Sequence, residues 1–212
     1  MARRVFFSFH YDDVADFRVN VIRKSGVLRH KGNTSKFIDK SLWEAARLKS
    51  KQALQEVIDD GLNGCGITAL LIGSETVDRK WVRYELVKSL IEGKGILSIH
   101  LNRIRSRSTG KISSKGVNPL SKLKLRVDSE CEKIYFYELI GRKWFPFELI
   151  PYVNNRQKNS VIFSNGGFWK QSQCGREFKF SELFPQEYCW VNDDGYNNFP
   201  TWVEKAARQV GR

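Results

Sequence analysis

Short apolar segments alternate with amphipathic segments along the first half of the chain. Arg4–Phe9 is β-branched and aromatic and ends at polar residues, and Ile67–Ile72 is a nearly continuous apolar run. Both patterns are typical of buried strands, and an apolar run without alternation is expected in a parallel sheet covered on both faces. Gly95–Leu101 is a third such segment, and Lys36–Ile38 is a candidate for a further short strand.

The segments between these strands have either helical spacing or the polar composition of a loop. Ser25–Asp39 is polar and predicts a loop. The first expected helix is capped by Asp12 or Asp13 and runs through about Lys24, with Val14, Phe17 and Val21 on its apolar side. The clearest helix lies within Ser41–Leu62, where Leu54, Val57, Ile58 and Leu62 form an apolar stripe. A third helix, Trp81–Glu92, is ended by Gly93. This alternation predicts an α/β fold in which a parallel sheet has right-handed crossovers and helices on both faces.

The pattern changes after Leu101. Lys133–Glu138 and Lys143–Glu148 flank the turn residues Leu139–Arg142, which predicts a β-hairpin. Pro146 limits the second arm of this hairpin to an edge strand.

Beyond the hairpin the periodic pattern is weak. Pro151–Arg176 shows little regularity, Glu187–Val191 is a candidate short strand, and Thr201–Gln209 has the apolar side of a terminal helix. We therefore expect a core domain over residues 1–125 and a C-terminal extension over residues 126–212 that packs on it.

Composition is that of an ordinary globular protein. The chain has 212 residues, of which 41% are hydrophobic and 28% charged, enough to bury a core. No apolar run approaches the ~18 residues that a membrane span needs. The apolar run after the basic N-terminus is only Val5–Phe7, too short for a signal peptide, so the expected location is the cytoplasm.

The cysteines give no sign of a metal site. They lie far apart without a C-x-x-C pair, which argues against structural zinc and against a disulfide framework. We expect free thiols at all four positions, which are Cys65, Cys131, Cys174 and Cys189.

The formal net charge of +13 indicates an anionic partner. Asn102–Val127 alone holds eight basic residues and no acid. The favoured interpretation is a solvated, mobile loop, and the alternatives are a site for nucleic acid, a phosphorylated ligand or an acidic protein surface. The segment contains no aromatic residue, so base stacking is not expected there and nucleic acid is not an expected partner.

Candidate chemistry gathers at the start of the third helix. Trp81 and Glu85 are four residues apart and share one helix face, just beyond the end of a buried strand. Ligands of open parallel sheets bind at the carboxyl ends of the strands. Arg79, Lys80 and Arg83 add positive charge suited to a diphosphate. A W-x-x-x-E spacing also arises by chance, with Trp81 in the core and Glu85 paired to a surface lysine.

The end of the first strand supplies further candidates. Ser8 can hydrogen-bond, Phe7 or Phe9 can stack on a base, and His10 follows them. Other chemistries lack their motifs, because neither phosphate-loop pattern and no G-x-S-x-G elbow occurs. The three histidines are not paired for metal, and His100 lies in a predicted strand, where a core role is favoured.

Several segments together resemble the TIR-like family of bacterial Thoeris anti-phage systems. They cover most of residues 4–119 and a C-terminal stretch, whereas residues 125–185 match less well. The segments are Arg4–Asp13, Phe17–Val21, Ser41–Glu44, Leu71–Ser74, Trp81–Glu85, Gly93–Lys94, Ser114–Pro119 and Trp190–Asn197.

The resemblance implies a flavodoxin-like TIR fold and an enzyme that cleaves NAD+ at the nicotinamide–ribose bond. The expected product is a cyclic ADP-ribose isomer, a second messenger that activates a separate effector protein. The family's catalytic glutamate falls on Glu85, and its ligand-contacting aromatic residue falls near Phe6 or Phe7. NAD+ is then the substrate, with no metal and no further cofactor expected.

The full set of expected substrate-binding residues combines the family match with the chemistry above. It comprises Phe6, Phe7, Ser8, Phe9, Trp43, Ser74, Arg79, Trp81 and Arg83. A non-catalytic TIR-like adaptor is the main alternative, and a nucleic-acid-binding protein is the second. The product isomer, a phage-derived trigger, homo-oligomerisation and the role of residues 126–185 stay open at this point.

Overall fold

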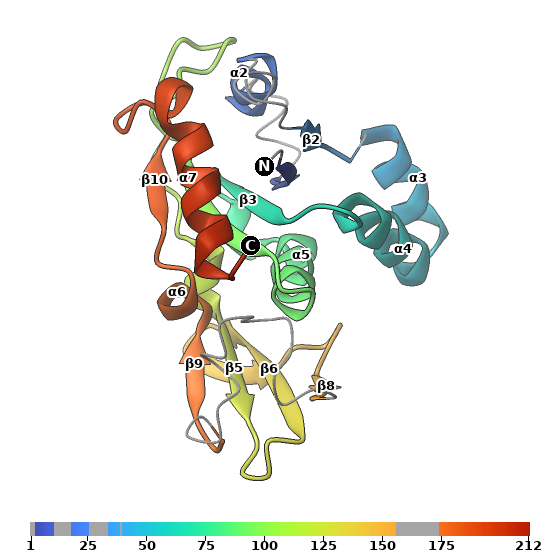
Figure 1. Cartoon of the computed structure of the whole chain (residues 1–212). Helices are drawn as coiled ribbons and strands as arrows, with labels where there is room; N and C mark the ends of the chain where they lie inside the picture. Colours follow the sequence, from blue (N-terminus) through green and yellow to red (C-terminus); the bar gives the residue numbers. More distant parts are fainter. Residues whose placement is uncertain (1–2, 11–17, 26–33, 39, 156–173) are drawn as a thin grey trace.

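A five-stranded parallel sheet forms the centre of the computed structural model, which describes residues 3–10, 18–25, 34–38, 40–155 and 174–212 (Figure 1). The strand order is β10–β4–β3–β1–β2, and each neighbouring pair runs parallel. The strands are β1 Arg4–Ser8, β2 Thr34–Lys36, β3 Ile67–Ile72, β4 Gly95–His100 and β10 Glu187–Cys189. The predicted α/β class with a parallel sheet is confirmed.

Helices cover both faces of this sheet. On one face, α2 (Arg18–Lys24) and α7 (Gly195–Gln209) pack on apolar side chains of β1, β3 and β4. On the other face, α4 (Lys51–Leu62) and α5 (Lys80–Ile91) enclose a second apolar cluster, to which α3 (Lys40–Lys49) contributes Ala46. Two faces need apolar cover because every residue of β3 and β4 is buried.

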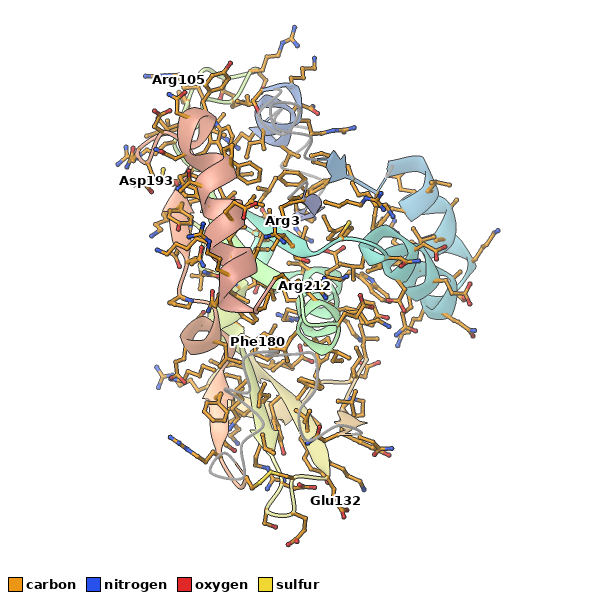
Figure 2. All side chains as sticks on the ribbon, in the orientation of Figure 1. Arg3, Arg105, Glu132, Phe180, Asp193 and Arg212 are labelled. Carbon is orange, nitrogen blue, oxygen red and sulfur yellow. A yellow bond between two sulfur atoms is a disulfide. The ribbon has the colours of Figure 1, made fainter. Side chains whose placement is uncertain are left out.

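The N-terminal strand is also tied to the terminal helix by an ion pair. Arg3, labelled in Figure 2 beside α7, places its Nε 3.1 Å from Oε1 of Glu204. The pair fastens the start of β1 to α7.

A second, antiparallel sheet follows β4. It begins after the 3₁₀ helix η2 (Pro119–Lys122) and lies beyond α5 in Figure 1. The strand order is β7–β6–β5–β9, and β8 also pairs with β6. Its strands are β5 Leu123–Val127, β6 Lys133–Ile140, β7 Lys143–Pro146, β8 Tyr152–Asn154 and β9 Glu177–Lys179, the last leading into α6 Phe180–Leu183. One side of this sheet packs on the same apolar cluster as α5.

The predicted hairpin is confirmed as β6 and β7, with a tighter turn than expected. Only Gly141 and Arg142 connect the strands, and Gly141 has φ 60°. A positive φ at the first of two turn residues is what glycine supplies in a type II′ turn. Pro146 ends β7, which forms the edge of the sheet as predicted.

The helix predicted within Ser41–Leu62 is confirmed as α4, and the structure adds a second helix, α3, in the first part of this segment. Ser50 has an extended backbone (φ −168°) and its side chain accepts a hydrogen bond from the Ala53 backbone N at 3.0 Å. A serine in this position replaces a missing helical bond and starts a new helix. Leu54, Ile58 and Leu62 of the predicted stripe are buried.

The prediction of a mobile loop over Asn102–Val127 is wrong for the last third of this segment. Residues 119–127 form η2 and β5, and four apolar side chains there are fully buried: Leu120, Leu123, Leu125 and Val127. Within β5, the buried residues Leu123, Leu125 and Val127 alternate with Lys124 and Arg126. Such alternation is typical of a strand with one covered face. The high charge of the segment concealed this alternation.

Two helix predictions needed smaller corrections. Thr201 is not the start of the terminal helix, because α7 begins at Gly195 and accommodates Pro200. In the first helix Val21 is 44% exposed, whereas Val19 and Ile22 are buried. The remaining expected members of that stripe, Val14 and Phe17, and the caps Asp12 and Asp13 lie outside the described residues.

The prediction of four free thiols is wrong for two of them. Cys131 and Cys174 form a disulfide, with Cα atoms 5.1 Å apart, while Cys65 and Cys189 are free. The 43 residues that separate the pair gave no spacing from which the bond could be recognised.

The predicted domain boundary at residue 125 falls inside β5. The predicted extension supplies β10 and α7 to the central sheet and its cover, so the chain crosses between the two sheets twice. The division into a core and an extension stays a prediction. No helix among the described residues is long and apolar enough to cross a membrane.

Candidate functional site

A cavity of about 470 Å³ opens beside the carboxyl end of β1. Its size is within the ~300–1,000 Å³ of small-molecule sites, and its place is where open parallel sheets bind ligands. Side chains from β1, α3, η1 (Thr76–Asp78) and α5 surround it. The lining residues are Phe7, Phe9, His10, Ile38, Trp43, Glu44, Arg47, Asp78, Arg79, Lys80, Trp81, Val82 and Glu85.

Glu85 is the buried carboxylate of this cavity. Its side chain is only 6% exposed, and one carboxylate oxygen accepts a hydrogen bond from Ser8 Oγ at the end of β1. Ser8 itself is fully buried. The predicted proximity of the first strand and the third helix is therefore present, and it places a strand residue and a helix residue in direct contact.

Burial controls the protonation of this carboxyl group. The loss of water around Glu85 raises its pKa from 4.5 to about 8, and the hydrogen bond from Ser8 acts in the opposite direction. With a pKa of about 8, Glu85 is mainly the neutral acid at pH 7. A cationic ligand beside it would favour the ionised form.

Aromatic side chains make up much of the cavity wall. Phe7, Phe9, Trp43 and Trp81 all line it, as expected from the sequence. Phe7 is held by a stacked contact with Phe37, with ring centroids 4.4 Å apart, and Trp81 meets Tyr84 edge-on at 5.8 Å. Such packed rings offer flat surfaces for the nicotinamide or adenine of a dinucleotide.

Positive charge enters the cavity from two helices. Arg47 of α3 lies with its Cζ 5.5 Å from the Trp43 ring, and Arg79 and Lys80 stand at the start of α5. The first turn of α5 has no acidic residue and no side-chain cap, so its backbone N–H groups also favour an anion. Glu44 and Asp78 are the acidic side chains of the wall besides Glu85.

Two of these cations are held by glutamates outside the cavity. Lys80 Nζ lies 2.5 Å from Oε2 of Glu148, which follows β7 and also pairs with Lys51 at 3.0 Å. Arg79 Nη2 lies 2.5 Å from Oε2 of Glu75. The second sheet thus reaches the rim of the cavity through Glu148.

Four expected substrate-binding residues do not line the cavity. Ser8 is fully buried and touches the site through its hydrogen bond to Glu85. Phe6 points to the opposite side of β1 from Phe7 and is fully buried in the α4–α5 cluster, as the alternation of a strand requires. Ser74 is exposed in the turn after β3. Arg83 lies about 200° around α5 from Trp81 and faces the second sheet, where its Nε is 3.1 Å from Oε2 of Glu138.

Sequence reasoning missed several members of the wall. Ile38, Glu44, Arg47, Asp78 and Val82 were not singled out, although Trp43 and Arg47 have the i,i+4 spacing of one helix face. Whether Glu44 and Arg47 line the cavity depends on where α3 packs, and local sequence patterns do not predict that position. His100 lies outside the cavity, 2% exposed, with Nε2 2.7 Å from Glu187.

Among the described residues, no group of three or more His, Cys, Asp and Glu side chains is arranged to hold a metal ion. The wall instead combines a buried carboxylate, flat rings and cations, which suits an organic ligand that carries phosphate.

A parallel sheet with helices on both faces and a carboxylate-bearing cavity at its carboxyl end is the arrangement of a TIR-like domain. The family model of the Thoeris protein ThsB, TIR-like domain, matches residues 6–106. A protein of Bacillus cereus (strain MSX-D12) named "Putative cyclic ADP-D-ribose synthase ThsB1" is 41% identical over 204 residues, which are 96% of this chain and 100% of that protein. The chain therefore belongs to the ThsB family of Thoeris TIR-like proteins.

Proposed function

We propose that this protein cleaves NAD+ at the nicotinamide–ribose bond and closes the remaining ADP-ribose into a cyclic isomer, with Glu85 as the catalytic carboxylate. The observation that carries the proposal is the position of Glu85, buried in the wall of a cavity made of aromatic and basic side chains. The name of the B. cereus relative, which describes a cyclic ADP-D-ribose synthase, supports the same reaction.

The chemistry needs one carboxylate rather than an acid–base pair. Nicotinamide leaves as a neutral pyridine from a cationic precursor, so the leaving group requires no proton. The positive charge moves to the ribose in an oxocarbenium-like transition state, as in glycosidases. A carboxylate held next to that ribose, away from water, stabilises the developing charge more strongly than it would in solution.

The raised pKa of Glu85 fits this role because the substrate is cationic. Before substrate binds, the carboxyl group is largely neutral at pH 7, since its pKa is about 8. The positive nicotinamide ring lowers that pKa when it binds beside Glu85. Binding of NAD+ then releases a proton and creates the charged form that the reaction uses.

The other lining residues have roles that follow from their chemistry. Phe7, Phe9, Trp43 and Trp81 stack on the rings and exclude water, which favours attack by a group of the same molecule over hydrolysis. An internal hydroxyl or adenine nitrogen forms the new bond to the ribose carbon, nicotinamide leaves, and one proton is released. Arg47 and Lys80 bind the diphosphate.

The biological role follows from the product. We propose that the cyclic nucleotide acts in the cytoplasm as a second messenger of anti-phage defence, read by a separate effector protein. A phage-derived trigger and self-association are further proposed partners. The competing function is a non-catalytic adaptor, which has no use for a buried carboxylate in a ligand-sized cavity.

Product analysis in infected cells tests this proposal. Bacteria that express the wild type or Glu85→Gln are infected with a panel of phages, and filtered small molecules are analysed by mass spectrometry. We expect a species with the mass of cyclic ADP-ribose in the wild type only. Linear ADP-ribose alone would make the protein a hydrolase, and no product from an abundant, folded wild type across the panel would favour the adaptor.

A further inference from the structure

The second sheet has one covered face and one face turned away from the core. Paired residues of antiparallel strands point to the same side, so the register assigns every side chain to a face. Leu123, Leu125, Ile134 and Phe136 are buried on the core side. Their sequence neighbours form the opposite side, called the outer face below, and each of them is half-buried or exposed.

Aromatic and basic side chains dominate the outer face. Four aromatic residues come from β6, β7 and β8, four basic residues come from β5, β6 and β9, and the one acidic residue is Glu177. Glu177 is paired with Lys124 at 2.7 Å, which leaves net positive charge on the face. The eight residues are Tyr135, Tyr137, Trp144, Tyr152, Lys124, Arg126, Lys133 and Lys179.

Rings and cations alternate across the strands of this face. Lys124 Nζ lies 5.0 Å from the centre of the Trp144 ring and 5.3 Å from that of Tyr137. Arg126 Cζ lies 5.1 Å from the Tyr135 ring, and Lys133 Nζ lies 5.3 Å from the Tyr152 ring. The rings of Tyr135 and Tyr152 are themselves neighbours, with centroids 5.9 Å apart.

We propose that the outer face binds single-stranded nucleic acid. An unpaired strand presents one flat base and one phosphate per nucleotide, which matches a surface where rings and cations alternate. A duplex hides the faces of its bases inside the stack, so it cannot use the rings. An acidic protein surface would engage the cations and leave the row of aromatic side chains without a role.

The sequence argued against nucleic acid because the basic segment Asn102–Val127 lacks aromatic residues. Folding removes this objection, since β5 at the end of that segment pairs with β6, which supplies Tyr135 and Tyr137. The outer face shares no residue with the NAD+ cavity. Its binding can therefore be tested without reference to the reaction.

Fluorescence anisotropy with the full-length chain tests the proposal. The probes are labelled 20-mers of single-stranded DNA and RNA, with a DNA duplex of the same length for comparison. We expect the protein to bind single strands at least about fivefold more tightly than duplex, and we expect Tyr135→Leu to weaken this binding at least about fivefold, the lower end of what one stacked ring contributes. Lys133→Gln is expected to reduce the slope of log affinity against log salt by about one unit.

Two variants on the same sheet serve as matched controls. Phe145→Leu and Lys143→Gln change an exposed aromatic and an exposed lysine of β7 whose register places them on the other side. Circular dichroism and thermal unfolding verify that all four variants fold. The proposal is overturned if single strands bind no better than duplex, or if Tyr135→Leu binds single strands as well as Phe145→Leu does.

Discussion

Glu85 combines two properties that rarely occur together in an isolated carboxyl group. It is buried, and it accepts a hydrogen bond from the neutral hydroxyl of Ser8 rather than from a cation. The hydrogen bond from Ser8 lowers its pKa but does not offset the effect of burial. The protein therefore carries a buried acid whose ionisation depends on what enters the cavity.

This arrangement predicts that Glu85 makes the empty protein less stable as pH rises. Its pKa of about 8 in the folded protein lies above the value of 4.5 in the unfolded chain, so the folded state binds the proton more tightly. The contribution of this proton to the free energy of unfolding is complete below pH 4.5 and is lost as pH rises through about 8. Glu85→Gln removes this titration. Urea unfolding at pH 5.5, 7 and 8.5 measures the free energy of unfolding of both proteins. The value for the variant minus that for the wild type should rise with pH, by at most ~1.4 kcal/mol per pH unit. A difference that is constant with pH would contradict a raised pKa.

Ser8 should tune the reaction through Glu85. The Ser8 hydroxyl favours the ionised carboxylate, so Ser8→Ala should raise the pH at which activity begins and lower kcat/KM at pH 7 about tenfold, the value of one hydrogen bond to a charged group. Ser89→Ala is the control, since it removes a buried hydroxyl of α5 that bonds Thr68 Oγ1 at 2.7 Å. Equal pH profiles for the two variants would rule out the role of Ser8.

Sequence patterns placed several residues at the cavity but did not give its full wall. Glu85, Trp81 and the residues after the first strand were found because helix spacing and the strand-end rule are local. Arg47 and Glu44 were not found, because their contribution depends on how α3 packs beside the sheet. Phe6 and Arg83 do not line the cavity, because motif membership does not say which side of a strand or helix faces it.

At the scale of elements, strands were predicted better than helices. The strands β1, β3 and β4 could be predicted without knowledge of their neighbours. A short, continuous apolar run such as those of β3 and β4 is typical of a buried strand. The sequence placed one helix within Ser41–Leu62 but did not separate α3 from α4. A single capping side chain decides where one helix stops and the next begins.

The cap at Ser50 gives a direct prediction. Ser50→Ala should lower the free energy of unfolding by about 1 kcal/mol, because the Ala53 N–H loses its acceptor. Denaturant unfolding measures this change, and Ser50→Asp should recover most of it. If Ser50→Ala left the stability unchanged, the two-helix description of this segment would be wrong.

At the scale of the whole molecule, the second sheet is joined to the helix that carries Glu85. Arg83 of α5 and Glu138 of β6 form an ion pair at 3.1 Å with side chains only 13% and 8% exposed. Their contacting atoms are not aligned for a hydrogen bond, so the contact is mainly electrostatic. Local patterns could not predict this pair, which brings together residues 55 positions apart in the chain.

Breaking this pair should be costly because it leaves a buried charge. Glu138→Gln should reduce the free energy of unfolding by about 3 kcal/mol. Glu75→Gln, which breaks the exposed pair with Arg79, should cost less than about 1 kcal/mol. Urea denaturation compares the two, and similar small losses would show that the second sheet is not held to α5 by charge.

The central claim is that Glu85 promotes departure of nicotinamide from NAD+. The most direct measurement adds NAD+ labelled in the nicotinamide ring to extracts of infected cells that contain the wild type, Glu85→Gln or Glu92→Gln. Glu92 is a second glutamate at the end of α5, outside the cavity. Release of labelled nicotinamide should fall at least about 1,000-fold in Glu85→Gln, a loss of ~4 kcal/mol of transition-state stabilisation, and should stay near the wild-type rate in Glu92→Gln. Wild-type release by a folded Glu85→Gln protein would contradict the account.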